Sequence, residues 1–161
     1  MTTRRFTYDI RPARASDLDA VEDLLREERL PTDGVRELFA NFLVAEGTYS
    51  SRVPVAPVGA IGLEHYGTAA LLRSAVVDPA WRGQGLGHAL VDAATDAARA
   101  RGATEMYLLT TTAEPFFAAL GFRIIGRDDV PDSVRQSVEF VSACPSSATV
   151  MARRIDVAHS A

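Results

Sequence analysis

A glycine-rich segment between a predicted strand and a predicted helix carries the strongest chemical signal in the chain. It reads Arg82-Gly83-Gln84-Gly85-Leu86-Gly87 and follows the strand end Ala75-Val76-Val77. Glycine adopts backbone conformations closed to other residues and lets a ligand approach the amides closely. The first amides of a helix have no acceptor within it, and the helix dipole adds partial positive charge there. The segment therefore predicts a phosphate or diphosphate site with Arg82 as an added cation, or else a turn that only caps a core helix.

Two familiar nucleotide-binding motifs do not fit this segment. A Walker A loop needs a lysine followed by serine or threonine, but His88 follows Gly87 and the chain contains no lysine. The dinucleotide-binding fingerprint needs a glycine where His88 stands, and a parallel strand-helix-strand unit around it. The sequence therefore argues against a nucleoside triphosphatase and against a dinucleotide-binding domain.

The same segment resembles the signature of the GNAT acyltransferase superfamily, Arg/Gln-x-x-Gly-x-Gly/Ala at the start of a helix, and Arg82 to Gly87 match every position. A second segment, Phe117-Ala118-Ala119-Leu120-Gly121-Phe122, is similar to the superfamily's aromatic-x-x-Leu-Gly-Phe motif. The resemblance implies acetyl-CoA as the cofactor. It further implies that Ala75, Val76 and Val77 pair with the pantetheine arm and that the amides of Arg82 to Gly87 hold the diphosphate. Phe117 would pack against the pantetheine or in the core.

Two subgroups of the superfamily look closest to this chain. Residues 108–113, followed by Phe116-Phe117, resemble the acetyltransferase domain of N-acetylglutamate synthase. Residues 62–64, 71–74 and 144–148 resemble the small stand-alone acetyltransferases found with arsenic-resistance genes. Arginines precede the last strand in the synthase family, whereas this chain has Cys144-Pro145-Ser146 there, so the resemblance leaves the acceptor amine open.

Acetyl transfer from a thioester to an amine needs a neutral amine, oxyanion stabilisation and protonation of the leaving thiolate. The resemblance implies that a backbone N–H near Val76 polarises the carbonyl. Many relatives carry a glutamate where this chain has Leu71, so Glu64 is the first candidate base and His65 the second. A water chain, with Glu64 as a solvated carboxylate, is the alternative. Phe117 stands where members of the superfamily usually have a tyrosine that acts as the general acid. Solvent or another group would therefore protonate the thiolate in this chain.

Three further positions are candidates for ligand contacts. Arg73 lies in an apolar run, where it either grips an acceptor carboxylate or pairs with a carboxylate on a neighbouring strand. Thr111 ends a predicted buried strand and offers a hydroxyl to the acceptor, although such residues are also common at strand ends. The single cysteine, Cys144, is either a ligand group or an inert apolar side chain. The three histidines and Cys144 lack metal-ligand spacing, so no metal site is predicted.

Hydrophobic periodicity predicts the elements that position these residues. Strands are expected at residues 6–11, 42–45, 55–66, 69–77, 104–111, 122–125 and 147–153. Helices are expected at residues 17–29, with Ser16 as the N-cap, and at 35–40, 86–101, 114–120 and 131–140. A polar turn is expected over residues 47–54. With the resemblance, this order predicts an α/β (α+β) domain of the GNAT fold, a mixed and mostly antiparallel sheet of about six to seven strands flanked by about four helices.

Length and composition exclude several classes of protein. The chain has 161 residues, 47% hydrophobic and 24% charged, which is typical of one globular domain, expected to span residues 1–161 with a core at about 8–155. The net charge of −4 without a basic run argues against a nucleic-acid surface and a polybasic membrane patch. With one cysteine and no signal-peptide or membrane-spanning stretch, we expect a soluble cytoplasmic protein.

The sequence therefore predicts an acetyl-CoA-dependent N-acetyltransferase that forms a ternary complex with the amine of a small molecule. The resemblance implies an amino-acid-like acceptor or a role in resistance to arsenic or other toxic compounds. It also implies a homodimer, because relatives often dimerise through their last strands. The alternative function is a non-catalytic acyl-CoA-binding or sensor module, favoured by Leu71 and Phe117 at the positions of the usual base and acid.

Overall fold

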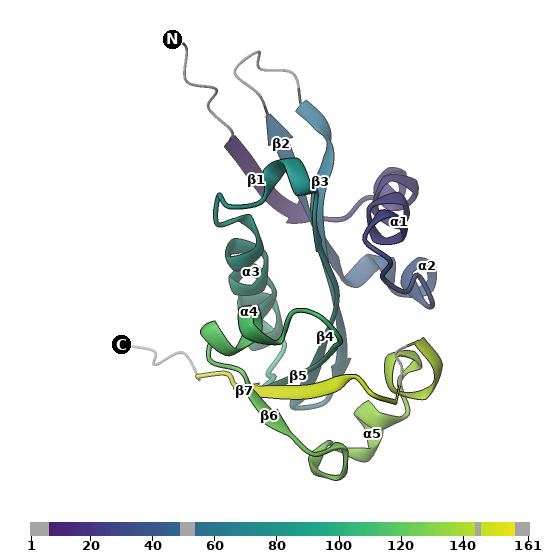
Figure 1. Cartoon of the computed structure of the whole chain (residues 1–161), viewed down its shortest axis with the longest axis vertical. Coiled ribbons are helices and arrows are strands. Elements are labelled where there is room, and N and C mark those ends of the chain that lie inside the picture. Colours follow the sequence, from purple (N-terminus) through teal and green to yellow (C-terminus); the bar gives the residue numbers. More distant parts are fainter. Residues whose placement is uncertain (1–6, 49–53, 144–145, 157–161) are drawn as a thin grey trace. The chain divides into compact units, whose positions relative to one another are not determined.

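The computed structural model describes residues 7–48, 54–143 and 146–156 (Figure 1). Its strands are β1 (Thr7–Pro12), β2 (Phe42–Thr48), β3 (Pro54–Tyr66), β4 (Ala69–Val77), β5 (Glu105–Thr110), β6 (Arg123–Ile125) and β7 (Thr149–Arg154). Its α-helices are α1 (Leu18–Glu27), α2 (Val35–Leu38), α3 (Leu86–Ala100), α4 (Glu114–Ala119) and α5 (Asp132–Arg135). Most of the predicted elements are therefore present, and their ends shift by a few residues.

The strands form one sheet in the order β1-β2-β3-β4-β5-β7-β6. The pairs β1–β2, β2–β3, β5–β7 and β6–β7 are antiparallel, whereas β4 and β5 run parallel over Ala69–Leu71 and Glu105–Tyr107. A parallel pair needs a crossover connection, and α3 supplies it between β4 and β5. The predicted fold class, a mixed and mostly antiparallel sheet with flanking helices, is confirmed.

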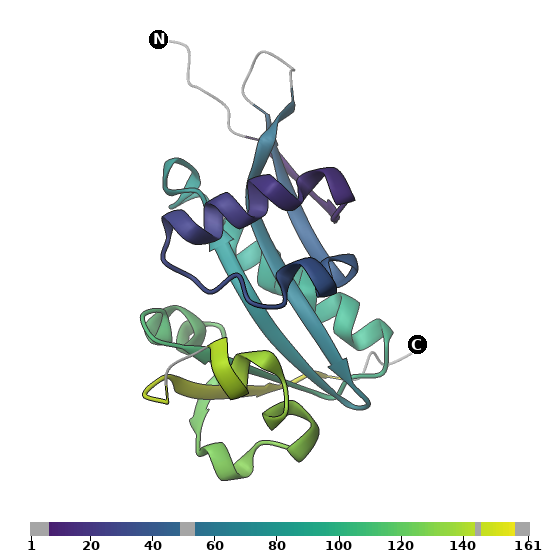
Figure 2. The same cartoon turned by 90° about the vertical axis from the view of Figure 1, so that its right-hand side faces the viewer.

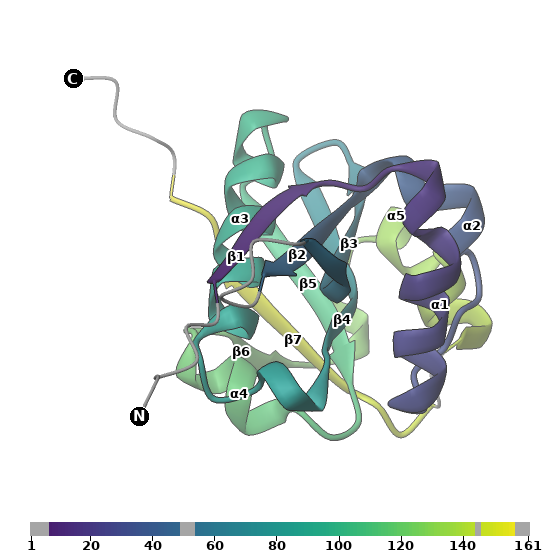
Figure 3. The ribbon, with the colours of Figure 1, turned by 90° about the horizontal axis from the view of Figure 1, so that it is seen from above.

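Close packing divides the chain into two compact units, and each is described by itself. The first comprises Met1–Gly62 and Ser74–Ala94. In it, α1 and α2 lie against one face of the strands and the start of α3 against the other (Figures 2 and 3). Ala60 packs in the core with residues of α1, while a Cβ on the neighbouring Gly59 would point at Leu86 and Leu90 of α3. Successive residues of a strand face opposite sides, so β3 supplies both layers.

The second unit comprises Leu63–Arg73 and Thr95–Ala161. Its core contains Leu71 of β4, Tyr107 of β5 and Ala152 of β7. Val130, just before α5, and Val134, within α5, pack in the same core. The side chains of residues 106–108 in β5 are buried, and β4 and β7 pair with β5 on its two sides. The expected organisation of residues 1–161 as a single domain stays a prediction.

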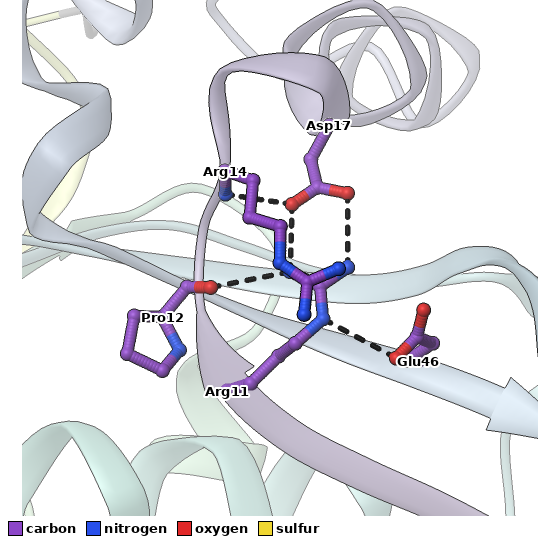
Figure 4. Close-up of polar contacts among 5 residues, drawn as sticks. All are labelled: Arg11, Pro12, Arg14, Asp17 and Glu46. Carbon is purple, nitrogen blue, oxygen red and sulfur yellow. Dashed lines mark hydrogen bonds and ion pairs between the residues drawn. The ribbon is translucent and has the colours of Figure 1, made fainter.

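A polar network joins β1, β2 and the entry to α1 in the first unit (Figure 4). Arg11 donates to both carboxylate oxygens of Asp17, at 2.7 and 3.0 Å, and through Nε to Glu46 at 3.3 Å. The amide of Arg14 also donates to Asp17, at 2.7 Å. The hydrogen bonds from Arg11 hold the pKa of Asp17 below its usual value, against the opposing effect of burial. Asp17 therefore fixes the entry of the chain into α1.

We expect Asp17→Asn to lower the free energy of unfolding at pH 7 by about 2 kcal/mol, because it removes a bidentate, charge-assisted pair. The pKa of Asp17 is depressed in the folded state, so ionised Asp17 stabilises the fold above the unfolded pKa of about 3.9. This stabilisation is lost as the pH falls through the folded pKa. Urea unfolding at pH 7 and pH 3 should therefore show a gap between wild type and variant that narrows in acid.

The exposed Asp19, in the first turn of α1, provides the control for this experiment. Asp19→Asn should change the free energy of unfolding by less than about 0.5 kcal/mol at either pH. A gap between wild type and the Asp17 variant that is equally wide at pH 3 and pH 7 would show that the carboxylate of Asp17 does not provide the stabilisation.

Three sequence predictions were wrong in detail. The polar turn expected over residues 47–54 starts too early, because β2 continues to Thr48 in register with Thr7 of β1. The helix expected over residues 131–140 is interrupted: α5 ends at Arg135, and a π-helical turn at Glu139–Ala143 brings Glu139 to a partner on β4. Ser16 lies inside a 3₁₀ turn and is not the N-cap of α1. In the first two cases a contact between residues distant in sequence overrides a local signal.

Candidate functional site

The glycine-rich segment lies in the first unit, between the end of β4 and the start of α3. Two hydrogen bonds of Asp78 fix its approach: the amide donates to the carbonyl of Val58 at 2.8 Å, and Oδ1 accepts from the amide of Ala80 at 2.9 Å. A 3₁₀ turn at Pro79–Trp81 follows. The indole of Trp81 is 1% exposed, and a Cβ on Gly47 would lie 2.6 Å from it, so β2 and the turn pack without a gap. The start of the loop is therefore closely packed and hydrogen-bonded.

Gly83 and Gly85 adopt left-handed backbone conformations, with φ of +80° and +78°. A Cβ at either position would meet nothing within 4 Å, so the backbone conformation, and not crowding, requires glycine. The carbonyl of Gly85 accepts a helical bond from the amide of Ala89 at 3.0 Å. Among the described residues, none accepts a hydrogen bond from the amides of residues 83–87. The loop thus has successive amides without an acceptor among the described residues, and the space at the Cβ positions of Gly83 and Gly85 is open.

The electrostatic setting of the loop is positive at the backbone. The first turn of α3 contains no acidic residue, so nothing there opposes the partial positive charge of a 15-residue helix. The Arg82 side chain is 54% exposed, and its Nη2 contacts Oε2 of Glu28 at 2.6 Å. Leu86 is 1% exposed in the core, so only its backbone remains available to a ligand. A loop of this kind can hold a phosphate or diphosphate through backbone amides.

The strand end that precedes the loop begins at a strained residue. Ser74 adopts φ +55°, a left-handed conformation that costs a non-glycine residue about 1–3 kcal/mol. The parallel register of β4 with β5 ends three residues earlier, at Leu71. Of the three residues predicted to contact a pantetheine arm, Val76 is 4% exposed, and Ala75 and Val77 are half-buried. Their side chains therefore pack, and a ligand would meet mainly their backbone.

Glu64 and Arg73 meet in a buried cluster of the second unit. Nη1 of Arg73 contacts Oε2 of Glu64 at 3.0 Å, and Nη2 contacts Oε1 of Glu139 at 3.1 Å. The hydroxyl of Tyr66 donates to the other oxygen of Glu64. Burial, followed by the bond to Glu64, raises the pKa of Tyr66, which keeps the hydroxyl protonated as a donor. The ion-pair alternative for Arg73 is confirmed, while the roles of Glu64 as a base and of Arg73 as an acceptor ligand stay predictions.

The other predicted residues of the second unit have separate surroundings. Thr111 is exposed just after β5, and the hydroxyl of Thr110 accepts from the amide of Ala113 at 3.0 Å at the approach to α4. Phe117 is 6% exposed, with its ring centroid 5.1 Å from that of Phe116 and 5.6 Å from that of Phe122. Phe117 therefore contributes to an aromatic core, and Thr111 remains free to meet a ligand.

The remaining positions singled out from the sequence are His65, Leu71 and Cys144. Burial, and then the charge of Arg101, lowers the pKa of the half-buried His65, so this imidazole is neutral at pH 7. Leu71 is fully buried. In the ranges 7–48, 54–143 and 146–156, no three histidine, cysteine or carboxylate side chains gather as metal ligands, and no helix has the length and apolarity to cross a bilayer. Cys144 lies outside the described residues.

Sequence reasoning did not identify Glu28, Ser74 or Glu139. Glu28 follows another glutamate at the end of a predicted helix, which is the usual place for solvated carboxylates. Ser74 has no sequence signal, because a left-handed serine inside a strand looks like any other strand residue. Glu139 stands between Val138 and Phe140, and that interrupted apolar run was the only available signal of a buried charge.

A family model described as an acetyltransferase (GNAT) domain matches residues 39–124, just over half of the chain. Among curated protein sequences, none matches significantly.

Several solved structures share the fold. N-acetylglutamate synthase from Neisseria gonorrhoeae, complexed with coenzyme A and N-acetyl-glutamate, superposes with a TM-score of 0.77 at 19% identity, covering 93% of this chain and 35% of that one. Rv2747 from Mycobacterium tuberculosis, in complex with CoA and NLQ, superposes with a TM-score of 0.75 at 25% identity, covering 92% of this chain and 99% of that one. Ard1 from Thermoplasma volcanium superposes with a TM-score of 0.68 at 23% identity, covering 92% of this chain and 98% of that one. This chain spans about a third of the length of the synthase.

Proposed function

The chain belongs to the acetyltransferase (GNAT) domain family, and from that premise we propose that it transfers an acetyl group from acetyl-CoA to the amine of a small molecule. The observation that carries the proposal is the loop at residues 83–87, with two left-handed glycines and open backbone amides at the start of α3. The coenzyme in the structures of the N. gonorrhoeae synthase and Rv2747 supports CoA as the ligand.

The loop fits a diphosphate on structural grounds. The Cβ positions of Gly83 and Gly85 point into open space, so a ligand can approach the backbone where any other residue would intrude. The amides of residues 83–87 would donate to the diphosphate oxygens, and Arg82 would add a cation. The pantetheine arm would lie along the backbone of Ala75, Val76 and Val77. Phe117 would act through packing of α4 and not through direct contact, since its ring is enclosed by two other phenylalanines.

The chemistry would rest mainly on positioning. Acetyl-CoA supplies an acetyl group activated as a thioester, and the products are an N-acetyl amine and the CoA thiol. A backbone N–H at the end of β4, with Val76 as the candidate, would donate to the acetyl carbonyl oxygen as it gains negative charge. Holding the amine against the thioester replaces a bimolecular encounter by an internal one, which removes several kcal/mol from the barrier.

The candidates for proton transfer are Glu64 as the base and, in place of a side-chain acid, solvent. Glu64 remains the candidate base, but each of its oxygens already accepts a hydrogen bond, from Tyr66 or from Arg73. A base must reach the proton that it removes, so a water chain competes with Glu64 for this role. Thr111, exposed just after β5, is the candidate to orient the acceptor. Solvent would protonate the thiolate, because Phe117 has no proton to donate and a thiol pKa of about 8.5 does not demand a strong acid.

The acceptor is proposed at the level of a class. An amino-acid-like amine is supported by the fold of the N. gonorrhoeae synthase, whose structure contains N-acetyl-glutamate. A role in resistance to arsenic or other toxic compounds and a homodimer are further proposals that rest on the sequence resemblance. A cytoplasmic location is a proposal that rests on the single cysteine and the composition of the sequence. The acidic net charge of −4 supports a small-molecule acceptor over a nucleic acid.

The alternative function is an acyl-CoA sensor that binds the coenzyme without turnover, favoured by Leu71 and Phe117 at the usual base and acid positions. Calorimetry with CoA and acetyl-CoA, followed by thiol release from acetyl-CoA with a panel of amino acids and polyamines, separates the two. We expect binding together with amine-dependent thiol release. Binding without release would favour the sensor, and no heat with either coenzyme would overturn both.

A further inference from the structure

Glu28 holds the cation of the glycine-rich loop. Its Oε2 lies 2.6 Å from Nη2 of Arg82, which is 54 residues further along the chain. The Glu28 side chain is 25% exposed and that of Arg82 is 54% exposed. Among the described residues, Glu28 is the one carboxylate paired with the Arg82 guanidinium. The cation next to the proposed diphosphate position is therefore already neutralised by the protein.

The two partners differ in how firmly they are held. Glu28 caps the C-terminus of α1, and its amide donates to the carbonyl of Leu24 at 3.2 Å. The next residue, Arg29, adopts φ +58°, and the amide of Leu30 returns to the carbonyl of Leu25 at 2.8 Å. This closed helix end fixes the backbone of Glu28 and adds the partial negative charge of a helix C-terminus. Arg82 has a long, mostly exposed side chain, so it is the partner that can move.

We propose that Glu28 competes with the diphosphate for Arg82 and so promotes release of CoA. The inference rests on the proposed function, which places the diphosphate at the amides of residues 83–87. A bound diphosphate draws Arg82 away from Glu28, so the free energy of the Glu28–Arg82 ion pair is lost when CoA binds. As CoA leaves, Glu28 takes Arg82 back. Differences in affinity between variants of one site appear mostly in the dissociation rate, and product release limits the turnover of many enzymes.

The test compares two neighbouring glutamates in the full chain. Glu28→Gln keeps the shape and the hydrogen-bonding capacity of the side chain and removes its charge. We expect CoA to bind about three- to ten-fold more tightly and to dissociate more slowly by a similar factor, as suits one partly exposed charge. Glu27→Gln is the matched control, because Glu27 is exposed and none of the described residues forms an ion pair with it. Calorimetry and stopped-flow displacement with CoA in low-salt buffer measure both quantities.

A double-mutant cycle identifies the route of the effect. In the Arg82→Gln background, we expect Glu28→Gln to change the affinity for CoA by less than about two-fold, because no cation remains to compete for. An unchanged or weaker affinity in the Glu28 single variant overturns the inference, as does an equal gain with and without Arg82. These results leave the proposed function standing. A wild-type chain that gives no heat with CoA overturns the inference and the proposed function together.

Discussion

Replacing Gly83 and Gly85 together by alanine should weaken CoA binding by more than about 30-fold. Both residues adopt φ near +80°, where an L-residue with a Cβ is disfavoured by about 1–2 kcal/mol. The two alanines together would shift the loop toward other conformations by about 2–4 kcal/mol, and binding would have to reverse that shift. This free energy corresponds to about 30- to 1,000-fold in the dissociation constant. Calorimetry with CoA measures it directly.

Gly102 provides the matched control for the loop glycines. It follows α3 with φ of +88°, and a Cβ there would also meet nothing within 4 Å. Gly102→Ala should therefore lower the free energy of unfolding by about 1 kcal/mol, while the affinity for CoA stays at the wild-type value. Wild-type affinity in the loop double variant would show that the amides of residues 83–87 do not bind the coenzyme.

The loop was predictable from the sequence because its signals are local. Three glycines in five residues, a strand before them and an amphipathic helix after them together specify a strand-loop-helix with free amides. The structure then assigned different roles to these glycines: Gly83 and Gly85 are left-handed, whereas Gly87 lies within α3. The fold class followed from the same local patterns, read along the whole chain.

The pairing of the charged groups was only partly predictable, because some of the partners are distant in sequence. Arg73 was recognised as a charge in an apolar run, and an ion pair to a neighbouring strand was one of two interpretations. Its second partner, Glu139, lies on a π-helical turn where periodicity had indicated the end of a regular helix. The pairing of Arg82 with Glu28 joins a loop to a helix end 54 residues earlier. Spacing along the chain does not encode such pairs.

The buried cluster around Arg73 carries the largest stability effect that we expect. Arg73→Met would leave the carboxylates of Glu64 and Glu139, each with a side chain under 10% exposed, without the guanidinium that both contact. Breaking a buried ion pair from one side costs about 3–5 kcal/mol. In a chain of this length each kcal/mol corresponds to roughly 2–4 °C in Tm, so the Tm of the Arg73→Met variant should fall by about 6–20 °C. The triple variant Glu64→Gln, Arg73→Met, Glu139→Gln should recover part of this loss, because no buried charge then remains at the three positions.

Arg123→Met is the control, since Arg123 pairs with Glu105 at 3.0 Å but is 58% exposed. Arg123→Met should lower the free energy of unfolding by less than about 1 kcal/mol, and an equal loss in both variants would contradict the importance of burial.

Glu64→Gln tests whether Glu64 is the catalytic base, because it leaves one carboxylate and one guanidinium in the Glu139–Arg73 pair. If Glu64 removes the proton of the amine, kcat for thiol release should fall by about 100-fold or more while Tm changes little. If Glu64 only holds Arg73, activity should follow the folded fraction.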